Sequence, residues 1–415
     1  MKRNKAVTQP VDIQPTPIFD SIHFVKEQSL SEHYTKQPYS ILDFKQAKSF
    51  LLSYSNNQAT FNAYRRETEK LLHWAWLIAK KSVRDLKRED IEAYIDFCQN
   101  PPYSWVSIKK SPRFIEKNGQ RITNLEWRPF VSTVSKTAHH HGKQPSIKKH
   151  ALSQKTIQEI FTITSSFYNF LIREQYTEIN PITHIRQKSH FITKVQGGTK
   201  IRRLSELQWH YVIETAELMA NENPAKHQRT LFMLTAFYSM YLRISELASS
   251  ARWTPKMGDF YCDYDGLWWF TTIGKGNKQR QISVSDSMLA ALRRYRKHLH
   301  LTPLPSHGDE TPLIAKALGN GPITSITHIR NIIQSCFDRA IEQLRLDGFC
   351  DDADALQQAT VHWLRHTGIS DDVKTRPREH VRDDAGHSSS AITDKYIDIE
   401  LRARHASGKK KLVKL

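Results

Sequence analysis

The sequence predicts a mainly α-helical protein of two domains, the second of which carries one small antiparallel β-sheet. Three observations lead to this fold class. The chain has 415 residues, and typical domains of roughly 100–200 residues suggest two or three compact units. Apolar residues recur every three or four positions over long stretches, which is typical of amphipathic helices. Residues 260–284 alternate as strands do, with turn signals at Asp265-Gly266 and Gly274-Lys275-Gly276-Asn277 that predict three strands.

The first domain is predicted to be all-helical and to cover residues 41–184. Residues 1–40 precede it, and their prolines and polar side chains indicate a flexible arm with at most one short helix. Helices are expected at residues 60–79 (with Thr60 as the cap), 86–97 and 153–174. In the first helix, Trp74 and Trp76 cannot both lie at the centre of one apolar stripe, so one should face a neighbouring element.

A basic segment, residues 103–150, interrupts the helical pattern of this domain. Aromatic residues are interleaved with its cations, and Asn118-Gly119 predicts a tight hairpin turn. Two interpretations stay open. The segment contacts the DNA backbone over packed aromatic rings, or it is a solvated insertion that its aromatic residues hold against the helices. The candidate DNA contacts within it are Lys109, Lys110, Arg113, Arg128, Lys148 and Lys149.

A basic linker is predicted at residues 185–203, where Gly197-Gly198 indicates flexibility. Its candidate phosphate contacts are Lys194, Lys200, Arg202 and Arg203. The second domain is predicted to cover residues 204–415 and to open with a capping box at Ser205 and Gln208. Residues 397–415 are expected to form a short tail.

The charge of the chain predicts a polyanionic partner. Its net charge is +19 and its sequence pI is about 9.6, so its affinity for nucleic acid should fall steeply as salt rises. The four cysteines form no CxxC pair, which favours a reducing, intracellular compartment. The chain opens with no signal peptide, and its longest apolar runs are too short to span a membrane. A cytoplasmic protein is expected.

The stretch from residue 359 to residue 396 carries the clearest chemical pattern. His362 and Arg365 are three positions apart, so on a helix they project from one face. Gly386-His387 follows, and Tyr396 comes nine residues after that histidine. A cation, an imidazole and a phenol could converge on one small anion, for which a phosphodiester is the natural candidate. Tyr396 would then be the nucleophile, activated by cations and a proton acceptor.

Two upstream stretches complete the pattern: LRISEL, which contains Arg243, and GKGNKQR, which contains Lys275. At this point the chain resembles the tyrosine recombinases, or phage-type integrases. That family carries an arginine in an LRxSEL helix, a lysine in a GKGNKxR hairpin turn, HxxR, GH and then the tyrosine. All five elements occur here in that order. Two positions depart from the family pattern: Tyr241 stands where a glycine is usual, and Asp384-Ala385 where an apolar pair is common.

The resemblance implies an N-terminal core-binding (SAM-like) helical domain and a C-terminal α+β catalytic domain, which together clamp DNA. Arg243 and Arg365 present rigid guanidinium forks to phosphate oxygens. A DNA 5′-hydroxyl leaves poorly unless protonated, and Lys275 is the candidate general acid. His362 is expected to assist removal of the proton from Tyr396, and His387 to hydrogen-bond a nonbridging oxygen. Glu246 is expected to orient Arg243 or His362. Two further candidate DNA contacts are Lys278 and Arg280. His366 and His380 are given no chemistry.

The predicted function is site-specific recombination or integration through a 3′-phosphotyrosyl intermediate, for a mobile element. Such chemistry stores the energy of the cleaved bond, so it requires neither a metal nor a nucleotide cofactor. The expected partners are a specific double-stranded DNA site and three further copies of the chain, a tetramer on two duplexes. Whether an accessory DNA-bending protein joins them stays open. The expected location is the bacterial cytoplasm or nucleoid. The alternatives are a type IB topoisomerase-like enzyme and a DNA-binding regulator that does not cleave.

Overall fold

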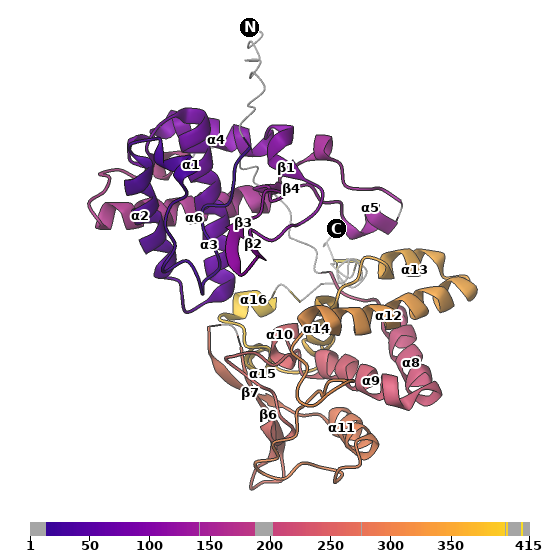
Figure 1. Ribbon diagram of the computed structural model, residues 1–415. Coiled ribbons are helices and arrows are strands. Elements are labelled where there is room, and N and C mark those ends of the chain that lie inside the picture. The colour runs from indigo at the N-terminus through magenta and orange to yellow at the C-terminus, as the bar shows by residue number, and fades with distance from the viewer. Residues whose placement is uncertain are drawn as a thin grey trace, which may run out of the picture. The chain divides into compact units, whose positions relative to one another are not determined.

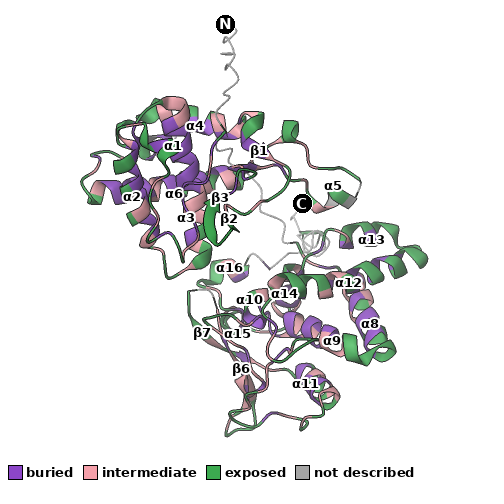
Figure 2. Ribbon diagram, viewed as in Figure 1, coloured by how far each residue is buried: buried purple, intermediate pink, exposed green. Residues whose placement is uncertain are grey.

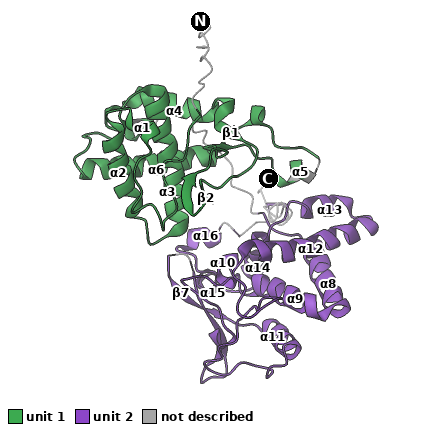
Figure 3. Cartoon of the chain, in the orientation of Figure 1, with its two compact units in different colours: residues 1–197 green, residues 198–415 purple. Residues whose placement is uncertain are grey.

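The chain forms two compact units, residues 1–197 and 198–415 (Figure 3). The computed structural model describes residues 14–140, 142–186, 202–274, 276–394, 396 and 408–409. Helices dominate both units and a three-stranded antiparallel sheet lies in the second, which confirms the predicted fold class. The predicted linker and tail lie largely outside the described residues. Over the described ranges, no helix has the length and apolarity needed to cross a bilayer.

The first unit is built around two long helices, α3 and α6, which pack on each other and on α2. The N-cap of α3 is Asn57, three residues before the predicted Thr60, and its side chain accepts hydrogen bonds from two backbone N–H groups. Ser153 caps α6 as predicted. The helices of this unit are α1 (Glu32–Thr35), α2 (Ser40–Leu52), α3 (Gln58–His73), α4 (Arg88–Gln99), α5 (Lys136–His140), α6 (Gln154–Arg173) and α7 (Thr183–Arg186).

A π-helical turn, Trp74–Ala79, continues α3 and removes the conflict between its two tryptophans. The wider turn changes the angular spacing of the side chains, so both rings lie inside. Trp74 is 4% exposed and Trp76 is fully buried. The indole N–H of Trp76 donates to the carboxylate of Asp43 at 2.8 Å, which satisfies its one buried donor.

Residues 14–40 pack on this core, which corrects the predicted flexible arm. Ile18, Phe19 and Val25 are each at most 2% exposed. The backbone N–H of Phe19 donates to the buried carboxylate of Glu69 at 3.2 Å, and the N–H of Ile18 donates to the same oxygen. A buried carboxylate requires such donors, so the arm is held by α3.

The insertion contains the predicted hairpin, β2 (Phe114–Lys117) and β3 (Gln120–Thr123), with Lys117 opposite Gln120. Asn118 and Gly119 have φ of 52° and 73°, as this two-residue turn requires. Two shorter strands, β1 (Val106–Ser107) and β4 (Phe130–Val131), pair in parallel. Trp105 and Phe130 of this segment belong to the core of the first unit. Aromatic residues therefore do anchor the insertion to the helices.

In the second unit, α9 packs against α8, α11 and α14 (Figure 1). The predicted capping box at Ser205 and Gln208 opens α8. Buried residues line the inner faces of these helices (Figure 2). The helices are α8 (Glu206–Glu222), α9 (Pro224–Ser239), α10 (Ile244–Leu247), α11 (Asp286–His298), α12 (Ile326–Leu346), α13 (Cys350–Leu356), α14 (Val361–Asp372), α15 (Arg378–Ala385) and α16 (Ser390–Asp394). The sheet is β5 (Phe260–Cys262), β6 (Trp268–Ile273) and β7 (Gln279–Ser283) in that order.

Candidate active site

Helix α14 presents three side chains of the site. Arg365 lies three residues after His362, and His366 follows Arg365 directly. His366 therefore lies one helical turn after His362. The two imidazole rings meet edge to face with their centroids 4.2 Å apart. Arg365 is only 2% exposed. The helix therefore brings two imidazoles and a buried guanidinium to one place.

Tyr396 lies against this helix, 7% exposed. Its hydroxyl oxygen is 2.6 Å from Nδ1 of His366, and its ring is 5.6 Å from the ring of His387, centroid to centroid. The sequence predicted that His362 assists removal of the proton from Tyr396, whereas in the structure His366 makes the contact. The signal was present, since His366 is one turn from His362, but spacing alone does not rank the two.

Two backbone carbonyls hold the guanidinium of Arg365. Its Nη2 donates to the carbonyl oxygen of Ala385 at 2.6 Å, and its Nη1 donates to that of Tyr241. Tyr241 has a φ of 49°, in the left-handed region that favours glycine. The backbone at the first departure from the family pattern is thus glycine-like. Burial of the aromatic ring, which is fully enclosed, offsets a cost of about 1–2 kcal/mol for this conformation.

The carboxylate of Glu246, 1% exposed, binds two arginines. Its Oε1 accepts from Nη1 of Arg243 at 2.9 Å and from Nη1 of Arg280 at 2.7 Å. Its Oε2 accepts from Nη2 of Arg280 at 2.8 Å and from the backbone N–H of Arg243 at 2.7 Å. Burial alone would raise the pKa of Glu246, but the hydrogen bonds and charge of Arg280, then those of Arg243, hold that pKa below its usual range.

The β6–β7 turn reaches this pair of arginines through Gly274. A Cβ at that position would lie 3.1 Å from Oε1 of Glu246 and 3.0 Å from Nη1 of Arg280, closer than nearly all real contacts. A larger residue at this position would have to displace these side-chain atoms by a few tenths of an ångström. Lys275, the predicted general acid, is the next residue and lies outside the described residues.

Gly386 ends α15 in the left-handed conformation, with a φ of 64°, and turns the chain toward His387. Nδ1 of His387 is 2.9 Å from Oγ1 of Thr393. Arg243 donates from Nη2 to the carbonyl of Gly386 at 3.4 Å. The predicted GH pair is thus brought to both Arg243 and Tyr396.

Burial and positive charge control the ionisation of this site. Burial, followed by the charge of Arg243, lowers the pKa of Arg365 to about 9. Burial and the neighbouring His362 lower the pKa of His366 to about 3, and burial and Arg365 lower that of His387 to about 4. The histidines are therefore neutral near pH 7. Burial raises the pKa of Tyr396, against the opposing charge of Arg365. A phenol, neutral imidazoles and excess guanidinium charge together suit an anionic ligand.

No family model matches the sequence. Among curated proteins, the chain is similar to the tyrosine recombinase XerD of Oceanobacillus iheyensis, 24% identical over 225 residues that make up 53% of this chain and 63% of that protein. It is also similar to the tyrosine recombinase XerC of Thermodesulfovibrio yellowstonii, 25% identical over 257 residues, 60% of this chain and 73% of that protein. The first match thus spans less than two thirds of its relative's length.

Solved structures share the fold. The XerH site-specific recombinase, bound to palindromic difH substrate in a post-cleavage complex, has a TM-score of 0.53 at 13% identity, covering 93% of this chain and 92% of that one. The Tn1549 transposon integrase, in complex with a circular intermediate DNA, has a TM-score of 0.50 at 13% identity, covering 88% and 98%. These sequence relatives are tyrosine recombinases, and the solved structures share the fold of this chain. The chain has the two-domain architecture that its sequence predicts.

The predicted DNA contacts of the chain lie in different environments. Arg113 forms an ion pair with the buried Glu69 and lies 4.7 Å from the ring centroid of Trp127, with its side chain 14% exposed. Arg280 is likewise enclosed, its side chain 9% exposed and bound to Glu246. These two face protein rather than solvent. The exposed candidates are Lys109, Lys110, Lys148, Lys149, Arg202 and Lys278. Lys194 and Lys200 lie outside the described residues.

The other two candidates are half-buried. Arg128 donates to the carbonyl oxygens of Leu125 and Trp127, both at 2.7 Å. Nη1 of Arg203 is 3.7 Å from Oδ1 of Asp371. Both arginines thus already have partners within their own unit.

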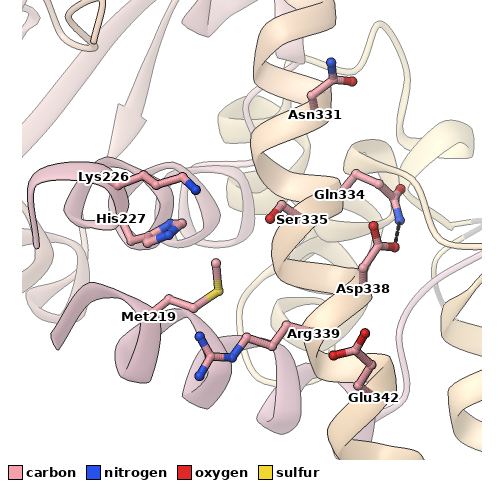
Figure 4. Close-up of a pocket in the computed structure, with 9 residues that line it drawn as sticks. All are labelled: Met219, Lys226, His227, Asn331, Gln334, Ser335, Asp338, Arg339 and Glu342. Atoms are coloured by element: carbon pink, nitrogen blue, oxygen red, sulfur yellow. Dashed lines mark hydrogen bonds between the residues drawn. The ribbon is translucent and has the colours of Figure 1, made fainter. Parts of the chain in front are cut away.

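A hollow of about 500 Å³ lies between α12 and the neighbouring ends of α8 and α9, apart from the residues around Tyr396 (Figure 4). Its lining is polar, and Arg339 at its rim pairs with Glu222 at 2.6 Å. Within the described ranges, no three His, Cys, Asp or Glu side chains are placed to hold a metal ion together.

Replacing Glu246 with glutamine is expected to lower the free energy of unfolding by about 3–5 kcal/mol, because it leaves the enclosed Arg280 without a counter-charge. The effect should depend on pH. The pKa of Glu246 is held below its usual range in the folded protein. Its contribution to the free energy of unfolding is therefore fully present above about pH 4.3 and is lost as pH falls through the pKa of the folded state. Thermal unfolding of both proteins between pH 3 and pH 7 measures this.

Glu310→Gln is the matched control, because Glu310 pairs with Lys256 at a site where its own side chain is 75% exposed. That variant should change stability by less than about 1 kcal/mol. Equal losses in the two variants would contradict the structural role given to Glu246.

Proposed function

We propose that this protein is a site-specific DNA recombinase or integrase of a mobile genetic element. It cleaves and rejoins duplex DNA through a 3′-phosphotyrosyl intermediate. One observation carries the proposal. The hydroxyl of Tyr396 lies 2.6 Å from a neutral imidazole nitrogen, beside a buried arginine and among excess positive charge. A nucleophile, a proton acceptor and an anion site therefore coincide. The relatives are named tyrosine recombinases, and the structural neighbours were solved with DNA.

In the proposed reaction, the oxygen of Tyr396 attacks the phosphorus of a DNA phosphodiester. A bond from that oxygen to phosphorus forms, the bond from phosphorus to the 5′-oxygen breaks, and the 3′ side stays attached to the protein. His366 accepts the phenolic proton at Nδ1. A phosphate in the site would raise the pKa of His366 from its low value, because an anion favours the charged imidazole. This makes the resting, neutral ring a better base once DNA is bound.

Arg243 and Arg365 bind the nonbridging oxygens, where charge accumulates in the transition state. If Nδ1 of His387 accepts from Thr393, its Nε2 carries a proton that it can donate to one of the same nonbridging oxygens. His362 supports His366 through its ring contact. Lys275 remains the proposed acid that protonates the leaving 5′-oxygen, as the resemblance implies. Religation reverses these steps with a second 5′-hydroxyl.

The proposed partners are a specific double-stranded DNA site and three other copies of the chain, in a tetramer on two duplexes. The charge of +19 supports DNA as the partner, because releasing counterions from phosphates favours binding to a cation-rich protein. The proposed location is the cytoplasm, with the protein associated with the nucleoid. Strand transfer by this route stores the phosphodiester energy in the tyrosine link and draws on no cofactor.

Covalent trapping tests the proposal. The protein would be incubated with nicked duplexes that carry the DNA flanking its own gene. The nick lets the short cleaved fragment diffuse away, so that the adduct persists. EDTA would be present to remove divalent metal ions. The expected result is a denaturant-resistant adduct whose linkage maps to Tyr396 by mass spectrometry. Tight, salt-sensitive binding without any adduct would favour a regulator that does not cleave. Relaxation of supercoiled plasmid by a monomer would favour the topoisomerase alternative.

A further inference from the structure

The two positions at which the chain departs from the family pattern are linked through one side chain, that of Arg376. The hydroxyl of Tyr241 accepts from Nη1 of Arg376 at 3.0 Å. Oδ2 of Asp384 accepts from Nη2 of Arg376 at 2.6 Å. Asp372 binds both Arg376 and Tyr241: its Oδ2 accepts from Nη1 of Arg376 at 3.1 Å and also from the hydroxyl of Tyr241. A tyrosine for glycine and an aspartate for an apolar residue thus form one network.

The two ends of this network are buried and one of them is anchored to the sheet, whereas the side chains of Arg376 and Asp372 are 31% and 34% exposed. Tyr241 is fully buried and Asp384 is 6% exposed. The backbone N–H and the hydroxyl of Ser283, at the end of β7, donate to the two carboxylate oxygens of Asp384 at 3.1 and 2.6 Å. Burial and the hydrogen bond to Asp384 act on Arg376 in opposite directions, and its partners raise its pKa above the usual value, so it stays charged.

The same two segments hold the buried arginine of the site. Arg365 donates to the carbonyl of Tyr241 and to the carbonyl of Ala385, the residue after Asp384. The distance between these two carbonyls fixes where the guanidinium lies and how it is turned. Arg376 joins the side chains on both sides of that gap, so it determines the spacing of the two acceptors.

A second path leads from Asp384 to the other arginine of the site. The carbonyl oxygen of Asp384 accepts from Nε of Arg280 at 3.0 Å. Arg280 in turn binds Glu246, which holds Arg243. A shift of Asp384 would therefore displace the guanidinium groups of both Arg365 and Arg243, which face the proposed phosphate.

We propose that Arg376 is a positioning residue for phosphate cleavage: it bridges Tyr241 and Asp384 and so sets the alignment of Arg365 and Arg243. This inference rests on the function proposed above and adds a residue outside the five sequence elements. Arg376 touches no reacting atom in this arrangement. Its effect should therefore appear in the rate of cleavage and not in the affinity for DNA, because the site's cations are all retained.

The test compares three variants by single-turnover cleavage of the nicked duplex at saturating DNA, together with the dissociation constant and the thermal midpoint of each. Arg376→Gln removes the two-armed bridge, and Asp384→Asn removes only the charge of one partner. Arg339→Gln is the matched control, because Arg339 makes a two-armed pair with Glu222 at 2.6 and 2.7 Å elsewhere in the same unit. All measurements would be made well below the lowest thermal midpoint.

We expect Arg376→Gln to cleave about 10–100-fold more slowly with DNA affinity changed less than about threefold, since misplacing a catalytic group by about 1 Å costs on the order of 10²-fold. Asp384→Asn should show a smaller loss of the same kind, and Arg339→Gln should cleave as the natural protein does. Arg376→Lys should stay slow, because an ammonium cannot bridge two acceptors in a fixed plane.

Two outcomes would overturn the inference: cleavage by folded Arg376→Gln at the natural rate, or full recovery of the rate in Arg376→Lys. If Arg376→Gln does not fold, Asp384→Asn decides, and a natural rate in that variant is equally contrary. Failure of the function itself is distinguishable, because then the natural protein forms no adduct at all.

Discussion

A Tyr396→Phe variant is expected to form no covalent adduct with any nicked duplex while binding DNA as tightly as the natural protein. The phenolic oxygen is the proposed nucleophile, and no other atom of the side chain can replace it. The ring itself should stay in place. Tyr396 shares a buried cluster with Tyr241, Ile369 and Val381, and phenylalanine retains all of that apolar contact. Gel separation in denaturant measures the adduct, and fluorescence anisotropy measures binding.

Tyr238→Phe is the matched control for this variant. Tyr238 lies in the same unit, stacks on Trp209 with ring centroids 4.3 Å apart, and donates its hydroxyl to Asp371 at 3.1 Å. Losing one such hydrogen bond should cost about 1 kcal/mol of stability and leave adduct formation unchanged. An adduct in Tyr396→Phe would assign the nucleophile to another side chain.

The local parts of this fold could be predicted because they depend on neighbouring residues. The hairpin at Asn118-Gly119 and the capping box that Ser205 opens are determined by backbone conformation and by side chains two or three residues away. The family elements work in the same way where the structure describes them. His362 and Arg365 lie on α14, and Gly386 ends α15 just before His387, so local sequence controls the backbone at these residues.

What could not be predicted depends on contacts between segments far apart in the chain. Glu69 is a buried carboxylate that needs donors, and the N-terminal residues supply them, although proline-rich composition alone suggested a flexible arm. Asp384 could have paired with its neighbour Arg382, but the buried position of its carboxylate brings it to Arg376 and Ser283 instead. Local pattern gives no measure of which partner lies within reach.

The choice between His362 and His366 has the same origin. The two histidines lie one turn apart on α14, and helical spacing alone makes them equivalent in their access to a tyrosine at least 30 positions away. Which histidine Tyr396 contacts depends on the turn at Gly386 after α15, because this turn sets the direction of the chain that leads to Tyr396. Tertiary structure selects His366, and the two histidines should therefore differ in their effect on the rate.

His366→Gln is expected to slow cleavage by about 10²–10⁴-fold, the usual contribution of a general base. Glutamine can still accept a hydrogen bond from Tyr396, so the variant separates proton removal from placement of the ring. His362→Gln should cost less, since His362 has no hydrogen bond to the tyrosine among those of the described residues. His380→Gln is the matched control, because this exposed histidine lies on α15 and should leave the rate unchanged. Single-turnover rates at saturating DNA measure all three.

The pH dependence provides an independent check. Burial and His362 lower the pKa of His366 to about 3, and burial and Arg365 lower that of His387 to about 4. A lowered pKa means that the neutral, proton-accepting form persists in mild acid. At subsaturating DNA, where the rate reports the unbound protein, we therefore expect no loss of cleavage between pH 7 and pH 5. A decline centred near pH 6.5 would indicate a histidine of ordinary pKa.

A substrate with sulfur in place of the bridging 5′-oxygen distinguishes two roles for a side chain: removing the proton from Tyr396 and donating a proton to the leaving 5′-oxygen. A thiolate leaves without protonation because its conjugate acid has a pKa near 8.5, so this substrate restores cleavage to a protein that lacks its general acid. His366→Gln should stay slow on it, since the missing step is removal of the proton from Tyr396. Full recovery would make His366 part of the leaving-group machinery. A natural rate in His366→Gln, with a large loss in His362→Gln, would assign removal of the proton to His362, as the sequence predicted.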